Sequence, residues 1–141
     1  MNGFLLDINV ISELIRPRPD PRVPAWVNST DEELLFLSVL TLGEIRKGIV
    51  SVPDKIRKTR LETWTNRVLI PNFEGRILPV DQAIAERWGE LTGALALNGM
   101  PVPVIDGLLA ATALQHNLTV VTRNTRHVRA TGAAVLDPWK T

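Results

Sequence analysis

Four polar residues, spread along the chain, border apolar segments in a pattern that could bind a metal ion. Asp7 directly follows the apolar run Phe4–Leu6, and Asn124 comes just after a segment rich in β-branched residues. Glu44 and Asp106 lie near the expected starts of two helices. Carboxylate and amide oxygens, without cysteine or histidine, favour a hard cation such as Mg²⁺ or Mn²⁺. These residue types are those of metal-assisted chemistry on a phosphate ester.

Each of these residues also has a purely structural interpretation, which the sequence leaves open. Asp7 could cap the helix that follows it, and Asn124 could stabilise a turn. Glu44 stands three residues after Thr41, which is the spacing of a capping box at a helix start. Asp106 could complement the dipole of its helix. Three acids at one edge of a sheet exceed what capping requires, so the metal interpretation depends on whether the fold brings them together.

Short apolar segments alternate with helical ones along the chain. The expected strands are Phe4–Leu6, Leu34–Ser38, Ile77–Val80, Leu118–Thr122 and Ala133–Leu136. The expected helices are Val10–Ile15, a short one holding Val23 to Val27, Thr41–Val50, Lys55–Leu69, Asp81–Leu97 and Pro103–His116.

This alternation predicts an α/β fold: a three-layer α/β/α sandwich around a mostly parallel central sheet. The run Phe4–Leu6 is apolar on both faces, as expected of a central strand covered by helices. Pro79 indicates that its own strand lies at an edge. Ligands of such sheets bind beyond the carboxyl ends of the strands, where Asp7 and Asn124 are expected to lie.

The composition bounds the class of protein. At 141 residues, the chain has the length of one domain, so we expect residues 1–141 to fold as a single unit. A net charge of +1 means that a nucleic-acid partner would have to meet a local basic patch. The lack of cysteine excludes disulfides and thiolate metal sites. No membrane span or signal peptide is evident, so we expect a cytoplasmic location without membrane contact.

Four segments, in their order and spacing, carry a family resemblance. They are Leu6–Leu14, Ser38–Gly48, Asp106–Ala113 and Val121–Asn124, and the ending Val135–Trp139 agrees with them. This ordered set resembles the PIN-domain family, and specifically the VapC-type toxins of bacterial toxin–antitoxin pairs. The resemblance runs nearly end to end. It implies a metal-dependent endoribonuclease on a Rossmann-like α/β/α fold, which leaves products with a 5′-phosphate and a 3′-hydroxyl.

The resemblance also implies roles for individual residues. The acidic metal ligands, for Mg²⁺ or Mn²⁺, would be Asp7, Glu44 and Asp106. The other residues of the site would be Asn124 as a catalytic residue, with Asn9 and Thr122 lining it. Asn124 fills a place where many PIN domains carry a fourth acid, and a neutral amide binds a cation more weakly. Ile8 stands where the family commonly has Thr, a smaller departure.

An RNA substrate requires cations to meet its phosphates. The candidates next to the proposed site are Arg123, Arg126 and Arg129, with Arg46 and Lys47 as a second set. The basic run Lys55–Arg60 is more typical of a solvated face. The side chains of Trp26, Trp64 and Trp88 lie on apolar helical stripes, which favours packing over base stacking.

The expected partners are an RNA substrate, with tRNA among the candidates, and a cognate antitoxin that places a basic side chain in the acidic site. A homodimer and a toxin–antitoxin hetero-oligomer are also implied by the resemblance, with Lys55–Leu69 a candidate contributor to the dimer. The principal alternative is a subunit of a DNA-binding regulatory complex with little or no nuclease activity. A metal-dependent phosphatase is a weaker alternative, because no nucleophile motif accompanies the acids.

Overall fold

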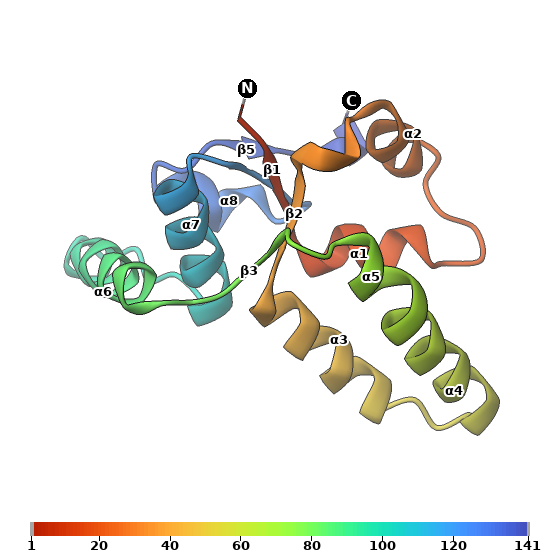
Figure 1. Cartoon of the computed structure of the whole chain (residues 1–141). Coiled ribbons are helices and arrows are strands. Elements are labelled where there is room, and N and C mark those ends of the chain that lie inside the picture. Colours follow the sequence, from red (N-terminus) through yellow and green to blue (C-terminus); the bar gives the residue numbers. More distant parts are fainter. Residues whose placement is uncertain (1, 141) are drawn as a thin grey trace.

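A five-stranded, wholly parallel sheet forms the centre of the molecule, with helices on both sides (Figure 1). The computed structural model describes residues 2–140. The strands are β1 (Phe4–Leu6), β2 (Leu35–Ser38), β3 (Ile77–Leu78), β4 (Thr119–Val121) and β5 (Val135–Leu136). They lie in the order β3-β2-β1-β4-β5, which confirms the predicted parallel sheet, with β3 at an edge.

Helical segments connect every pair of consecutive strands. The α-helices are α1 (Ile8–Leu14), α2 (Arg22–Ser29), α3 (Val39–Val50), α4 (Lys55–Trp64), α5 (Ile70–Asn72), α6 (Gln82–Leu97), α7 (Val104–His116) and α8 (Thr125–Ala130). Single turns of other helix types are η1 (Glu32–Leu34), η2 (Thr65–Leu69) and η3 (Pro138–Lys140). Within residues 2–140, no helix combines the length and apolar character needed to cross a membrane.

Two apolar cores, one on each face of the sheet, make the molecule three-layered. Leu5 and Leu6 are neighbours in β1 and point to opposite faces, because successive side chains of a strand alternate. Leu6 packs in a core with residues of α1, α2 and α3, whereas Leu5 packs with residues of α7 and α8. The two leucines are 1% and 0% exposed, so the predicted α/β/α sandwich is confirmed.

The side of the sheet to which successive strands are added changes at β1. From β1 the chain proceeds outward to β2 and β3, and it then returns to the other side of β1 to form β4. In open α/β sheets, the crevice at such a reversal is the usual ligand site. The backbone N–H of Asp7 donates to the carbonyl oxygen of Val121 at 2.9 Å, which ties the ends of β1 and β4 together at this point.

The predicted capping box at Thr41 and Glu44 is wrong. Helix α3 begins at Val39, and its cap is Ser38, whose side-chain oxygen accepts from the backbone N–H of Leu40 at 3.1 Å. The last residue of β2 is thus also the cap of α3, so no linker separates strand from helix. Thr41 is fully buried inside the helix, and Glu44 lies in the second turn rather than the first.

Other helix bounds differ from the sequence-based ones for local reasons. Helix α1 starts at Ile8 rather than Val10, because Asp7 caps it. The helix expected over Lys55–Leu69 continues to Asn72 through the wide π-type turn η2. Helix α6 begins directly after its cap Asp81, as the apolar spacing predicted.

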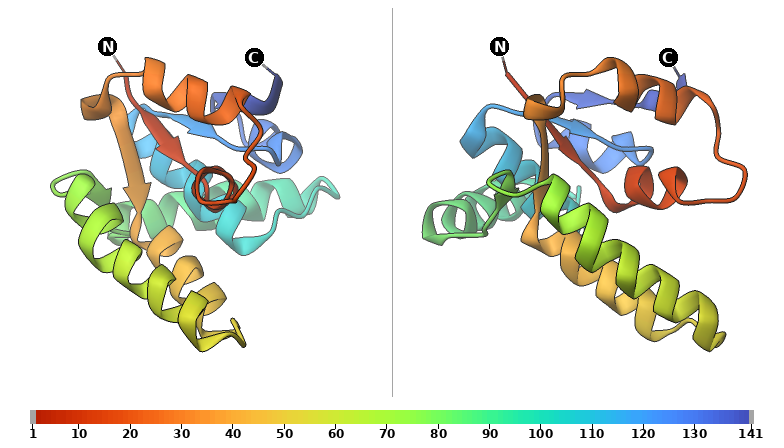
Figure 2. Two further views of the ribbon diagram at one scale, coloured as in Figure 1. Left: turned by 90° about the vertical axis from the view of Figure 1, so that its right-hand side faces the viewer. Right: turned by 45° about the vertical axis from the view of Figure 1, so that its right-hand side comes forward.

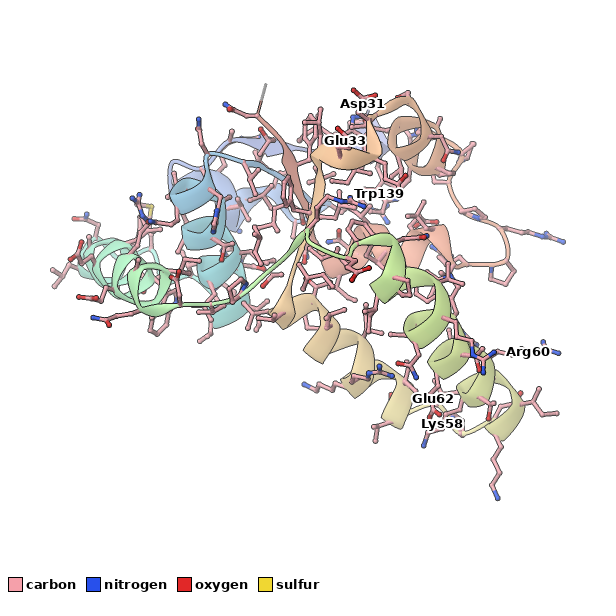
Figure 3. The ribbon with its side chains drawn as sticks, viewed as in Figure 1. Asp31, Glu33, Lys58, Arg60, Glu62 and Trp139 are labelled. Carbon is pink, nitrogen blue, oxygen red and sulfur yellow. The ribbon has the colours of Figure 1, made fainter. Side chains whose placement is uncertain are left out.

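Helices α3 and α4 lie side by side and form an arm that projects from the sheet (Figure 2). Lys58 and Arg60 lie on α4 towards the far part of this arm, away from the strand ends (Figure 3). This placement agrees with the interpretation of Lys55–Arg60 as a solvated face.

The three helical tryptophans pack against the protein. Trp26 makes an edge-to-face contact with Phe4, with ring centroids 5.1 Å apart, and Trp64 packs on the same core. Trp88 of α6 lies against α7 at Gly107, where an added Cβ would come within 3.0 Å of the indole. Packing rather than base stacking therefore accounts for these side chains.

Replacing Gly107 by Ala tests the contact between α6 and α7. Alanine favours a helix, but here its methyl group would also lie 2.9 Å from Thr92, so we expect a net loss of about 1–3 kcal/mol in the free energy of unfolding. Gly93→Ala in α6 is the matched control, since nothing lies within 4 Å of its Cβ; it should stabilise by up to ~1 kcal/mol. Urea unfolding of both variants measures the difference, and equal stabilisation by both would contradict this packing.

Candidate active site

Asp7 caps α1 and also lies at the end of β1, where the candidate site was expected, so its two interpretations are compatible. Its side chain is only 4% exposed. One carboxylate oxygen accepts from the backbone N–H of Ile8 at 2.7 Å. The other accepts from the Thr122 hydroxyl at 2.7 Å and from the Asn9 amide at 3.3 Å. These donors fix the direction of the carboxylate at the end of β1.

Asn9 and Thr122 also join the start of α1 to the end of β4. The Asn9 amide donates to the Thr122 hydroxyl oxygen at 3.2 Å, and its carbonyl oxygen accepts from the backbone N–H of Arg123 at 3.3 Å. The backbone N–H of Asn124 donates to the same hydroxyl oxygen at 3.0 Å. The side chain of Asn124 is exposed and makes no capping hydrogen bond to α8, so the turn-stabilising alternative does not account for it.

Glu44 and Asp106 face Asp7 closely enough for the three charges to interact. Burial raises the pKa of Glu44, and the negative charges of Asp7 and Asp106 raise it further, while Lys47 partly offsets them. Burial likewise raises the pKa of Asp106, with Asp7 adding to the effect and His127 opposing it. The predicted convergence of acids at this edge therefore has an electrostatic signature.

The arrangement fits a cation that keeps much of its water. Within residues 2–140, one oxygen of Glu44 is buried and has no hydrogen-bond partner, which leaves it available to a ligand. Over the same residues, no three acidic or histidine side chains converge closely enough to hold a metal ion together. Mg²⁺ is commonly held by one or two carboxylates with several waters, and this donor set suits that mode.

Two hollows of different character flank the acids. One, of about 540 Å³, is polar and is lined by Asp106, Arg123, Asn124, Arg126 and His127, among others. The second, of about 680 Å³, is lined mainly by apolar side chains around Glu44 and Lys47.

The predicted basic residues thus divide into two groups. Arg123 and Arg126 line the polar hollow, whereas Arg129 lies outside that lining on the same short helix. Lys47 is close to Glu44, but the Arg46 side chain turns away and donates to Asn66.

Residues 4–133 match the PIN domain family. The chain belongs to the PIN-domain family. Toxin FitB of Neisseria gonorrhoeae is 40% identical over 136 residues, which cover 96% of this chain and 98% of FitB. VapC ribonuclease Y4jK of Sinorhizobium fredii is 35% identical, over 97% of this chain and 98% of its own length. The predicted resemblance to VapC-type toxins is therefore confirmed.

A solved structure agrees with this family assignment. The structure of FitAB bound to an IR36 DNA fragment is similar to this chain with a TM-score of 0.92 and 39% identity, covering 96% of this chain and 95% of that one. The predicted PIN-like architecture is thus confirmed at the level of the fold.

His127 lies beside the candidate site, although the sequence did not indicate it. It lines the polar hollow, and its charge opposes the rise in the pKa of Asp106. The available signal was its spacing of three residues from Asn124, which places both on neighbouring positions of one helical face.

The raised pKa values of Glu44 and Asp106 predict how pH affects the metal-free protein. A carboxyl whose pKa is higher in the folded than in the unfolded state destabilises the fold at neutral pH. That destabilisation is relieved as the pH falls through the raised pKa towards the ordinary carboxyl range. We expect Glu44→Gln to raise the Tm at pH 7.5 in EDTA, and to raise it less at pH 5.

Thermal unfolding at the two pH values measures this effect, with Glu90→Gln on the exposed face of α6 as the control. Added Mg²⁺ should raise the Tm of the unaltered protein more than that of Glu44→Gln, because the variant lacks one of the charges that attract the cation. A lower Tm for Glu44→Gln in EDTA would show that Glu44 is instead a structural acceptor.

Proposed function

We propose that this chain is a VapC-type toxin: a cytoplasmic endoribonuclease that depends on Mg²⁺ or Mn²⁺. The observation that carries the proposal is the partial burial of Glu44 and Asp106 beside Asp7: burial raises the pKa of both groups, the neighbouring negative charges raise it further, and within residues 2–140 one buried Glu44 oxygen has no hydrogen-bond partner. Buried like charges are costly unless a cation compensates them. A divalent cation is the compensation that also has a chemical use at such a site.

The proposed mechanism is hydrolysis of an RNA phosphodiester bond by water. Asp7 and Asp106 would hold the cation, and a bound divalent cation would supply a lower pKa for water and polarisation of the scissile phosphate. Glu44, whose pKa is raised, orients the attacking water and accepts its proton. The water oxygen bonds to phosphorus and the 3′-oxygen leaves with a proton. Asn9 and Thr122 keep the Asp7 carboxylate in place, and Asn124 completes the rim.

The surroundings of the acids suit a polyanionic substrate. Arg123 and Arg126 line the hollow beside Asp106, where they can neutralise phosphates next to the cut. Without them, the acids would repel RNA wherever no cation is bound. Arg129 and the basic run on α4 lie outside this hollow and are not needed for the proposed role.

The names of the relatives support both the activity and a partner. Y4jK is named a ribonuclease and FitB a toxin, and the FitAB structure contains DNA. By analogy, a cognate antitoxin would bind this chain and place a basic side chain among the three acids, where it would compete with the metal. A homodimer within that hetero-oligomer is also proposed, and light scattering of the free protein would measure it.

A second candidate function is that of a subunit in a DNA-binding regulatory complex with little nuclease activity. The DNA-bound FitAB structure, at a TM-score of 0.92, is the specific observation in its favour. Both candidates use the same acidic site to bind the antitoxin. Cleavage of RNA by the free protein distinguishes them.

Removing a metal ligand should abolish cleavage without unfolding the protein. For Asp7→Asn we expect a loss of cleavage on the order of a hundredfold or more, because the amide weakens cation binding. The stability cost should be about 1–3 kcal/mol, which leaves the protein folded: Asn can still cap the helix, but its NH₂ group replaces one of the two oxygens through which Asp7 accepts hydrogen bonds. Asp54→Asn is the control for the loss of a capping carboxylate: Asp54 caps α4 by accepting from the backbone N–H of Ile56, away from the site.

The assay is incubation of the partner-free protein with structured RNAs, including tRNA, in Mg²⁺, Mn²⁺ or EDTA. Discrete cuts that need the metal and disappear in Asp7→Asn and Asp106→Asn support the endoribonuclease. Undiminished cutting by both variants would refute the assigned ligands. Absence of any cut, together with DNA binding by the antitoxin complex, would favour the regulatory subunit.

A further inference from the structure

Glu13 is a buried charged residue that the proposed mechanism does not use. It lies on α1, less than two turns after Asp7, and is only 4% exposed. A buried carboxylate is costly unless donors surround it. Glu13 accepts from the backbone N–H of Asp20 at 2.9 Å, from the Arg16 guanidinium at 3.2 Å and from the Trp139 indole N–H at 3.3 Å. The hydrogen bond from Asp20 is the main reason that its pKa is lowered.

These hydrogen bonds join α1 and the loop that follows it to a segment near the other end of the chain. Glu13 and Trp139 are separated by 126 positions, and the loop with Asp20 lies between α1 and α2. The backbone N–H of Trp139 donates in addition to the Asp137 carboxylate at 2.9 Å. The side chain of Trp139 is only 5% exposed and is directed into the molecule (Figure 3). Glu13 therefore fixes Trp139 through its indole N–H, and Asp137 fixes it through its backbone N–H.

The face of this fixed indole carries Arg123. The guanidinium carbon of Arg123 lies 5.2 Å from the centre of the Trp139 ring, within the range of a cation–π contact. The backbone N–H of Arg123 is bound by Asn9, and its side chain lines the hollow with Asp106. Hydrogen bonds from Arg22 are the main reason that the pKa of Asp20 is lowered to about 2, and Arg123 adds a smaller attraction, so the charge of Asp20 also attracts Arg123.

This contact separates Arg123 from the other cations near the site. Within residues 2–140, Arg123 is the one cation lining either hollow beside the acids that stacks on an aromatic ring. An exposed arginine loses side-chain entropy when it binds a ligand, and a preformed contact reduces that loss. Stacking on the indole also holds the guanidinium at the rim, where it cannot fold in among the carboxylates.

We propose that Trp139, oriented by the buried Glu13, is a positioning residue that holds Arg123 at the rim of the acidic site to bind an RNA backbone phosphate beside the scissile one. This inference rests on the proposed endoribonuclease function. It assigns a role to the Glu13–Trp139–Arg123 chain of contacts, and it distinguishes Arg123 from Arg129 as a substrate contact.

The first test measures RNA affinity in EDTA, where no cleavage occurs, by fluorescence anisotropy of a labelled tRNA over a range of salt concentrations. In Arg123→Ala, the slope of the logarithm of the binding constant against the logarithm of the salt concentration should decrease in magnitude by about 1. Trp139→Leu should weaken binding several-fold and shift this slope towards the value for Arg123→Ala. The double variant should bind no more weakly than Arg123→Ala alone. Arg129→Ala, which removes the same charge outside the hollow, is the control and should bind nearly as the unaltered protein does.

Trp139→Phe separates the two contacts of the indole, because it keeps an aromatic face but removes the N–H that binds Glu13. It should bind RNA with an affinity between those of the unaltered protein and Trp139→Leu. In Mg²⁺, Trp139→Leu should raise KM while kcat stays within about twofold, since the reacting groups are untouched. Additive effects of Trp139→Leu and Arg123→Ala, or unchanged binding by Trp139→Leu, would overturn the proposal. Unchanged binding by Trp139→Phe would remove Glu13 from it.

A second measurement does not depend on RNA. The side-chain N–H resonance of Arg123, assigned by its loss in Arg123→Lys, should be shifted by the indole ring current in the free protein. A resonance typical of a mobile, solvated arginine would overturn the positioning role, even if Trp139→Leu proved too unstable to assay. A shifted resonance in a protein that binds no RNA would instead show that the proposed function is wrong while the contact is right.

Discussion

The pairing of β1 between β2 and β4 is the constraint on which the site depends. Parallel strands end at the same edge of a sheet, so Asp7 after β1, the start of α3 after β2, and Thr122 after β4 arrive at one place. The backbone hydrogen bond from Asp7 to Val121 extends the pairing to the first residue of the site. Strands are added on one side of β1 and then on the other, and the connecting helices leave the sheet on opposite faces, so this edge stays open.

Within the site, the three carboxyl groups differ in how fully the protein satisfies them. Asp7 accepts hydrogen bonds from a backbone N–H, a hydroxyl and an amide, so its charge is compensated and its orientation fixed. Glu44 and Asp106 are partly buried beside that charge, and burial is the main reason that their pKa values rise. The protein thus fixes one carboxylate, and the other two carry the less favourable negative charges that the proposed cation would neutralise.

The rim of the site depends on contacts between distant parts of the chain. The buried Glu13 joins α1 to the loop that follows it and to η3. Through Trp139 it also connects with the guanidinium of Arg123, the residue after Thr122. The same helix therefore contributes to the acidic centre at its start and to the basic rim near its end.

The sequence by itself determined most of the architecture. The alternation of apolar runs with helical spacing predicted the parallel α/β sheet, and Asp106 lies in the first turn of its helix as expected. Local patterns failed where strand and helix join, since Thr41 and Glu44 have the spacing of a capping box but Ser38 takes the cap. The tertiary structure alone decided the turn on which Glu44 lies, the position of His127, and the partners of Glu13. Side-chain contacts across more than a hundred residues leave no periodic signal in a sequence, because only the folded sheet brings those segments together.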